Sequence, residues 1–172
     1  MMTTVFSDEI VLEMYEWHRA IIAGANRQAN AVLNKSKARA DMKDEEGWGN
    51  HIEGACGEAA VAKFLNLYWE GHVGAYTDTT RPDLKPNIEV KTRSKHWQDL
   101  LIRKHENREQ VFILVTGTSP EFRIRGWIWG ENGCQAKFFK SPNDRPPAYF
   151  IGVDHLSQDW QMLKEQYIWT HQ

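Results

Sequence analysis

The apolar run Val111–Val115 (VFILV) constrains the fold of this chain more than any other segment. Three of its five residues are β-branched, and β-branched and aromatic residues favour an extended backbone. A continuous apolar run of this length, bounded by the turn residues Gly117–Pro120, is typical of a strand that is buried on both faces. We therefore expect Val111–Val115 to form a buried central strand.

Two amphipathic helices are expected before this strand. Ser7-Asp8-Glu9 precedes apolar residues with helical spacing, which indicates a capped helix start, and the helix is expected to continue to Leu33. A second helix is expected over about Ile52–Tyr68. The charged segment Lys35–Asn50 between them indicates a helix end and a loop. The second helix begins with small residues that permit close packing: Gly54, Ala55, Gly57, Ala59 and Ala60.

Shorter elements complete the prediction. Strands are expected over Gly71–Thr77 and Ile88–Arg93, and a short edge strand over Tyr149–Ile151. The segment Trp97–Glu109 fits either a strand or a helix, and His155–Tyr167 is expected to form a closing helix.

The segment Phe122–Trp129 alternates in a way that predicts a half-buried strand. Strict alternation would place Phe122, Ile124, Gly126 and Ile128 on one face and Arg123, Arg125, Trp127 and Trp129 on the other. The second face is therefore a candidate surface for oligomer formation.

The composition limits the kinds of partner. The 172 residues carry a formal net charge of −2, which argues against a protein that coats long stretches of nucleic acid. Contact with nucleic acid must then be local, and an ordinary solvated surface is the alternative for each group of cations. The groups are Lys35, Lys37 and Arg39; Arg93, Lys95, Arg103 and Lys104; and Arg123 and Arg125. The eight tryptophans fit core packing or, alternatively, platforms for base stacking.

Cysteine usage and hydropathy bear on the compartment. The two cysteines, Cys56 and Cys134, form no C-x-x-C pair, which disfavours a thiolate zinc site. The polar segment Thr3–Glu9 lies where a signal peptide would be apolar, and no apolar stretch is long enough to span a membrane. We expect a cytoplasmic protein that does not contact membranes.

The segment Arg81–Lys91 carries the chemistry. Lys85-Pro86-Asn87 has the composition of a turn, and alternate residues of the following strand place Glu89 and Lys91 on one face. A hairpin that is symmetric about Pro86 would place Asp83 opposite Glu89. Like charges in that position are destabilising unless a cation compensates them. A divalent cation such as Mg²⁺, which prefers oxygen ligands, would do so.

Glu58 is a second candidate acid, on the apolar stripe of the second helix. A carboxylate there must be paired, hydrogen-bonded or bound to metal, because an isolated buried charge is costly. A core salt bridge or a helix-end acid remains the alternative reading. Glu53 is a rival acid, well round the helix from Glu58.

Together these residues resemble the PD-(D/E)xK nuclease superfamily, over about Ile52–Val115. The matching residues are Glu58, Pro82-Asp83 and Glu89-Val90-Lys91. A softer likeness, to small phage- or prophage-encoded members, lies in residues 54–60 and 123–128. The gap between Asp83 and Glu89 is short for the family.

The resemblance implies a fold of the α/β class. The implied architecture is a restriction-endonuclease-like mixed sheet flanked by helices, with an added N-terminal helix. We expect a single domain, with residues 1–50 as a helical extension and loop and residues 51–172 as the nuclease-like core with its C-terminal elements.

The resemblance also implies hydrolysis of DNA phosphodiester bonds with Mg²⁺ or Mn²⁺. The metal ligands would be Glu58, Asp83, Glu89 and the Val90 carbonyl, with Lys91 as a further catalytic residue. The candidate nucleic-acid contacts are Arg93, Lys95, Arg123 and Arg125. A homo-oligomer or a partner protein is a further expectation.

Less specific alternatives stay open. Glu89 and Lys91 could form a surface charge pair, and Asp83 could be only a turn residue. The chain could be a catalytically inactive module of the same fold that binds nucleic acid or protein, or an assembly protein that uses Trp127 and Trp129.

Overall fold

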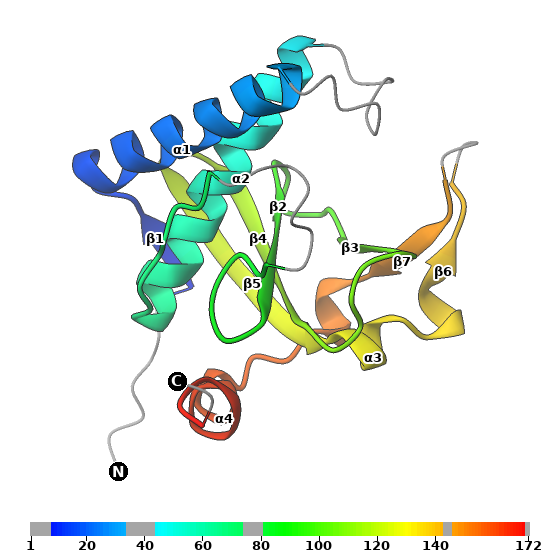
Figure 1. Ribbon diagram of the computed structural model, residues 1–172. Coiled ribbons are helices and arrows are strands. Elements are labelled where there is room, and N and C mark those ends of the chain that lie inside the picture. Colours follow the sequence, from blue (N-terminus) through cyan, green and yellow to red (C-terminus); the bar gives the residue numbers. More distant parts are fainter. Residues whose placement is uncertain (1–7, 34–43, 74–80, 143–145, 171–172) are drawn as a thin grey trace.

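The computed structural model describes residues 8–33, 44–73, 81–142 and 146–170, with the backbone alone at 44–46. It has a mixed α/β fold with two sheets (Figure 1). The helices are α1 (Met14–Leu33), α2 (Asp44–Leu65), α3 (Gly130–Gly133) and α4 (Trp160–Leu163), which continues as a π-helical turn over Lys164–Ile168. The strands are β1 (Glu9–Val11), β2 (Ile88–Arg93), β3 (Leu100–Arg103), β4 (Val111–Thr118), β5 (Glu121–Trp129), β6 (Phe139–Lys140) and β7 (Ala148–Ile151).

The larger sheet has the order β1-β5-β4-β2. Strand β2 is parallel to β4, with Ile88 opposite Val111, and the other neighbours are antiparallel. Strand β4 lies inside the sheet and Val111–Val115 are fully buried, which confirms the buried central strand.

Both faces of β4 are covered. Ile113 and Val115 belong to a hydrophobic cluster with α1, α2 and α4, whereas Phe112 and Leu114 belong to a second cluster with β3 and β7. The second cluster forms under the smaller antiparallel sheet, which has the order β3-β7-β6. The continuous apolar run is thus explained by packing on two sides.

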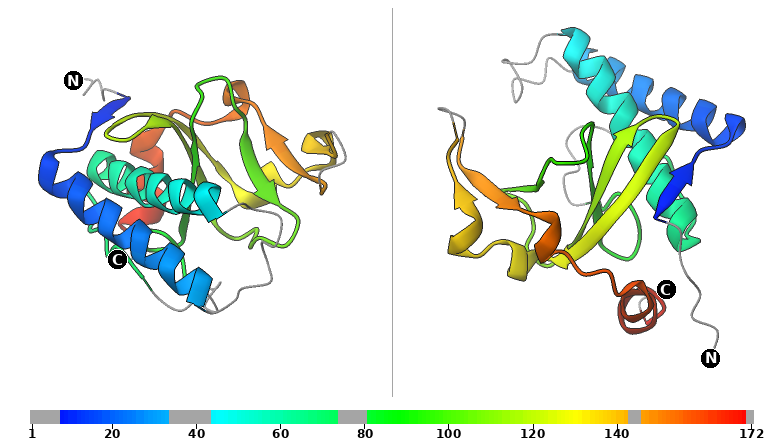
Figure 2. Two further views of the ribbon diagram at one scale, coloured as in Figure 1. Left: turned by 90° about the horizontal axis from the view of Figure 1, so that it is seen from above. Right: turned by 180° about the vertical axis from the view of Figure 1, so that it is seen from behind.

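Helices α1 and α2 run side by side on one side of the larger sheet (Figure 2). A Cβ at Gly57 of α2 would lie 2.0 Å from Thr92 Oγ1, so the small residue lets α2 pack directly on β2. A Cβ at Gly24 of α1 would lie 2.5 Å from the Ile52 Cα, so the two helices cross at backbone contact.

The N-terminal prediction was partly wrong. Helix α1 ends at Leu33 as expected but begins at Met14, because Glu9–Val11 pair with β5 instead of joining the helix. The loop expected at Gly47–Asn50 is part of α2, where Gly47 lies against the Gln28 side chain of α1. Helix α2 therefore crosses the boundary between residues 50 and 51 that was expected to separate the N-terminal extension from the core. The helix ends at Leu65, before Asn66, which has a positive φ (57°).

Other elements differ in detail. Gly71–Val73 form no strand, and the rest of the expected strand 71–77 lies outside the described residues. Ile88–Arg93 is a strand as expected, and the ambiguous segment 97–109 contains β3. Strand β7 lies between β3 and β6 and is not an edge. The closing helix starts only at Trp160, where the Asp159 side chain accepts a hydrogen bond from the Met162 N–H (2.9 Å).

A β-bulge overturns the predicted alternation of β5. Leu114 pairs with Gly126 whereas Val115 pairs with Ile124, so Arg125 is an extra residue. One extra residue moves every later side chain to the other face, and Gly126 has the positive φ (139°) that favours glycine. Trp127 consequently joins the helix-side core and is only 2% exposed, which contradicts an oligomer surface built on it.

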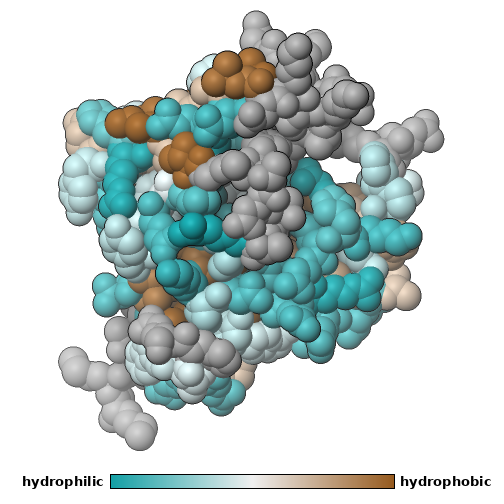
Figure 3. Space-filling view, in the orientation of Figure 1, coloured by the Kyte–Doolittle hydropathy of each residue, from teal (hydrophilic) through white to brown (hydrophobic). Residues whose placement is uncertain are grey.

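Across the residues that the structure describes, no helix has both the length and the apolar character needed to cross a membrane. Figure 3 shows hydrophobic patches over α1 and a mostly hydrophilic surface over β3 and the β6–β7 hairpin.

The close crossing of α1 and α2 predicts opposite effects for two glycine substitutions. Gly24→Ala should destabilise the protein by about 1–3 kcal/mol, because the new methyl group meets the backbone of Ile52. Gly49→Ala is the matched control in α2, where no atom of the part of the chain that the structure describes lies within 4 Å of the added Cβ. It should stabilise by about 0.5–1 kcal/mol through helix propensity. Thermal unfolding measures both, and equal effects would contradict the close crossing.

Candidate active site

A tight hairpin positions the first acid. Leu84 and Ile88 exchange two backbone hydrogen bonds (3.1 and 2.9 Å), so the hairpin is centred on Pro86 as expected. In this register Asp83 and Glu89 are the next residues on either side of the Leu84–Ile88 pair. The Asp83 carboxylate accepts a hydrogen bond from the Val90 N–H (2.8 Å), which fixes it beside β2.

The direction of the Val90 N–H also shows where the Val90 carbonyl points. The N–H and C=O of one strand residue point to the same edge of the strand, and the Asn87 carbonyl on the opposite edge bonds to Val111 of β4. The Val90 carbonyl therefore faces the side of Asp83, away from β4. A main-chain oxygen and a carboxylate thus share one edge of β2.

Lys91 is held by two carboxylates. Its Nζ donates to Glu89 Oε1 (3.0 Å) and to Glu106 Oε1 (2.5 Å), and it lies 5.6 Å from the centre of the Phe112 ring. Burial would lower the Lys91 pKa, but the charges of Glu89 and Glu106 outweigh burial and raise it. Lys91 is therefore a fixed cation.

Glu106 is a site residue that the sequence did not reveal. It follows β3, and its second carboxylate oxygen accepts a hydrogen bond from the Arg103 N–H (2.6 Å), which orients the side chain. It is part of no motif with Lys91, and only the path of the chain between β2 and β4 brings the two together. No pattern in the sequence could have identified it.

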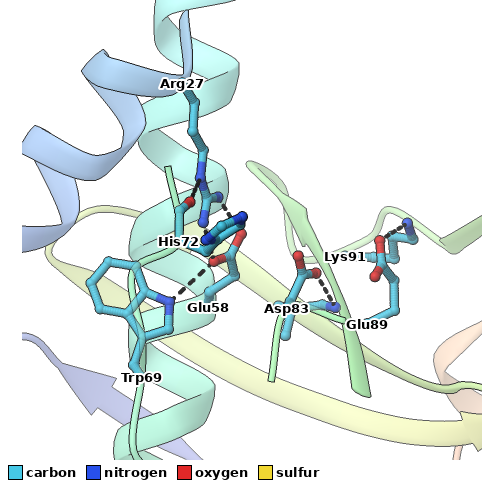
Figure 4. A network of polar contacts seen from close by, with 8 residues as sticks. Arg27, Glu58, Trp69, His72, Asp83, Glu89 and Lys91 are labelled. Atoms are coloured by element: carbon cyan, nitrogen blue, oxygen red, sulfur yellow. Dashed lines mark hydrogen bonds and ion pairs between the residues drawn. The ribbon is translucent and has the colours of Figure 1, made fainter. Parts of the chain in front are cut away.

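Glu58 forms the core salt bridge that the sequence left open as an alternative. Its carboxylate is buried and accepts two hydrogen bonds from Arg27 (2.5 and 2.8 Å) and one from the Trp69 Nε1 (3.1 Å) (Figure 4). Arg27 also donates to the His72 carbonyl (2.9 Å). Both oxygens of Glu58 are thus engaged, and the partner comes from α1, within the segment 1–50 that was expected to be an extension.

Asp83 faces Glu58 across the space between α2 and β2 (Figure 4). Burial raises the pKa of Asp83 well above its ordinary value, and the nearby charges of Glu58 and Glu89 raise it further. Burial also raises the pKa of Glu89, against the opposing effect of Lys91. Both shifts indicate carboxylates that lack sufficient positive charge nearby.

The charges around the site do not balance. Among the residues that the structure describes, the carboxylates of Glu58, Asp83, Glu89 and Glu106 face two cations, Arg27 and Lys91. The fully ionised cluster therefore carries a surplus of two negative charges, which one divalent cation would neutralise.

The donors fit a divalent cation in charge and in type, but they are not gathered around one point. Within the described part of the chain, no three His, Cys, Asp or Glu side chains form a group arranged to hold a metal ion. Asp83 and the Val90 carbonyl share an edge, whereas Glu89 is hydrogen-bonded to Lys91 and Glu58 to Arg27. Asp83, Val90 and Glu89 are the residues that could hold a metal. To do so, the Glu89 carboxylate would have to leave its hydrogen bond with Lys91.

The candidate nucleic-acid contacts separate into two places. Arg93 lines an open groove of about 690 Å³ that also contains Lys91, and Lys95 follows in the exposed turn after β2. Arg123 on β5 is paired with Asp8 and Glu9, and Arg125 is the bulge residue of β5. Arg93 therefore shares the groove with Lys91, whereas Arg123 and Arg125 lie on another strand, β5.

Two polar residues of interest have structural partners. Glu53, the rival acid, accepts hydrogen bonds from the N–H and the hydroxyl of Ser119 (both 2.8 Å) and so holds the β4–β5 turn. The His96 ring lies 2.8 Å from the hydroxyl of the buried Thr116.

Comparison with known proteins found no match among protein-family models, curated proteins or solved structures.

The buried surplus of charge predicts that Asp83→Asn stabilises the metal-free protein at neutral pH. A raised carboxyl pKa means that the folded state binds more protons than the unfolded state, so stability falls as pH rises above the unfolded value near 4. Removing the charge should therefore raise stability by about 1–3 kcal/mol, or roughly 2–10 °C in Tm. The gain should disappear below about pH 3, where Asp83 is protonated in both states.

Thermal unfolding across pH in the presence of EDTA measures this effect. The exposed Asp154→Asn is the matched control and should show no such pH-dependent gain. A destabilised Asp83→Asn variant at neutral pH would contradict the charge surplus.

The Arg27–Glu58 pair predicts a second stability effect. Arg27→Met should destabilise the protein by about 3–5 kcal/mol, because it leaves the buried Glu58 carboxylate without its cation. Adding Glu58→Gln to that variant should recover most of the loss. Denaturant unfolding of the single and double variants forms a double-mutant cycle, and additive effects would show that the pair is not coupled.

Proposed function

We propose that this protein is a metal-dependent nuclease that hydrolyses DNA phosphodiester bonds with Mg²⁺ or Mn²⁺. The observation that carries the proposal is the hairpin in which Asp83 and Glu89 flank the Leu84–Ile88 pair, with Lys91 beside Glu89 on the same strand. The surplus of two negative charges among the described residues around the site supports the binding of a divalent cation.

We further propose that the fold is restriction-endonuclease-like. In support, an acid-bearing helix α2 packs on a sheet whose strand β2 follows a hairpin and runs parallel to the buried strand β4. One feature departs from the family, because the connection Ser94–Gln110 contains β3 where the second core helix would lie.

In the proposed reaction, a water oxygen bonds to phosphorus as the bond to the leaving oxygen breaks, and the proton that the water loses passes through solvent to the leaving oxygen. Asp83, Glu89 and the Val90 carbonyl would hold the cation, which supplies an activated water and neutralises charge at the phosphate. Glu89 and Glu106 raise the pKa of Lys91 in the metal-free protein, and Glu106 would remain beside Lys91 when Glu89 holds the cation, so Lys91 would act as a cation beside the reacting phosphate. Arg27 holds Glu58, and its charge also faces Asp83 and Glu89.

A binding module without catalysis is the second candidate. The observation that favours it is the closed pairing of Glu58 with Arg27 and of Glu89 with Lys91. Such pairing satisfies two of the acids without a metal. Calorimetric titration with Mn²⁺ separates the candidates, because only the nuclease requires the cation.

Digestion of circular single-stranded and double-stranded DNA with Mg²⁺ or Mn²⁺ tests the nuclease proposal. Cleavage should require the metal and should fall by about 10²-fold or more in Asp83→Ala and Lys91→Ala, since both remove groups at the reacting phosphate. Asp154→Ala is the surface control and should cleave like the original protein. Circular dichroism checks that each variant is folded. Unchanged cleavage by either site variant would remove that residue from the mechanism.

A further inference from the structure

We propose that the groove beside Lys91 binds an unpaired strand of nucleic acid, so that single-stranded or locally unpaired regions are the substrate. The inference deepens the proposed nuclease function, but its binding step can be tested without metal. It rests on the shape, the charge and the exposed aromatic residue of one surface.

The groove lies between three elements that the fold brings together. Residues of α2, of the end of β2 and of β3 border it, and it measures about 690 Å³. That volume is in the range of sites that enclose small ligands, of about 300–1,000 Å³. It suits a few nucleotides of one strand and is too small to enclose a double helix. Because Lys91 lines the groove, a phosphate that lies in it meets the candidate active site.

Cations outnumber acids along this groove. Its lining contains Lys91, Arg93 and Arg103 together with Glu53 and Glu106, and the exposed Lys95 and Lys104 lie two residues after Arg93 and directly after Arg103. Of the two acids, Glu53 is bonded to Ser119 and Glu106 to Lys91. In a chain with a net charge of −2, this local path is the electrostatic footprint expected for a narrow strand.

Two of the residues that line the α2 side of the groove are glycines and carry no side chain. Gly49 and Gly54 both line it, and no atom of the described residues lies within 4 Å of a Cβ built at either residue. A glycine within a helix costs about 1 kcal/mol relative to alanine. Gly24, Gly47 and Gly57 have a packing reason, because neighbours occupy the space of their Cβ atoms. For Gly49 and Gly54, an open helix backbone that a ligand can approach closely supplies the reason that packing does not.

An exposed tryptophan is next in sequence to a residue that lines the groove. Trp97 is 78% exposed, in the turn where the Gln98 N–H bonds to the Lys95 carbonyl (3.1 Å), and Gln98 itself lines the groove. Exposed aromatic rings next to basic grooves stack unpaired bases, with about 1–3 kcal/mol per base. Bases inside a duplex are already stacked on each other, so Trp97 favours the unpaired strand.

Fluorescence anisotropy in EDTA tests the proposal. The probe is a short labelled oligothymidine, compared with the same strand annealed to oligodeoxyadenosine. We expect tighter binding of the single strand, and Trp97→Ala should weaken it by roughly 5- to 100-fold. Trp169→Ala, at another exposed tryptophan, is the matched control and should bind like the original protein. Gly54→Ala should weaken binding while raising Tm, a combination that loss of folding cannot produce.

The outcomes are separable from those of the nuclease proposal. Equal or tighter binding of the duplex, or the same affinity in Trp97→Ala and Trp169→Ala, would overturn the single-strand proposal even if metal-dependent cleavage occurs. Preferential binding of the single strand that Trp97→Ala weakens would support it even if no metal-dependent cleavage is found, and the proposed catalysis alone would then fail.

Discussion

The surplus of buried negative charge beside β2 is the constraint on which the site depends. Burying a carboxylate is unfavourable unless positive charge compensates it. Arg27 and Lys91 compensate part of the cluster formed by Glu58, Asp83, Glu89 and Glu106, and they hold its two ends. Asp83 lies between, with a main-chain N–H as its hydrogen-bond donor and a raised pKa. Carboxylates without enough compensating positive charge lower the stability of the folded state. Such groups are more typical of functional sites than of residues that only pack the core.

Helix α1 is part of this arrangement and not an appendage. Besides pairing with Glu58, Arg27 binds the His72 carbonyl, and two further α1 side chains, Arg19 and Asn30, bind the carbonyls of Trp69 and Val73 (both 3.1 Å). Three side chains of one helix thus hold the chain segment that follows α2. The same contacts place the cation Arg27 opposite the acids, so helix packing and site electrostatics depend on each other.

The sequence predicted the parts of the fold that depend on residues close to one another in the chain. The apolar run of β4 and the turn centred on Pro86 were predicted, and with that turn the antiparallel register in which Asp83 and Glu89 flank the Leu84–Ile88 pair. Other features depend on distant partners: β1 pairs with β5 instead of extending α1, and the bulge at Arg125 moves Trp127 into the core. Arg27 and Glu106 reach the site only through tertiary contacts, from a helix that packs on α2 and a turn after β3. No spacing rule relates either residue to the motif.

The position of Lys91 connects the acid cluster with the groove. Lys91 and Glu106 line the groove, whereas Asp83 and Glu89 are not among its described lining residues. A phosphate in the groove would therefore meet the Lys91 ammonium and its partner Glu106 first, with the carboxylates of Asp83 and Glu89 behind them. Those carboxylates repel a phosphate, and the repulsion is strong at low dielectric. A divalent cation between acids and phosphate would turn that repulsion into attraction. Metal dependence would thus follow from the charge distribution of the site, independently of the need to activate water.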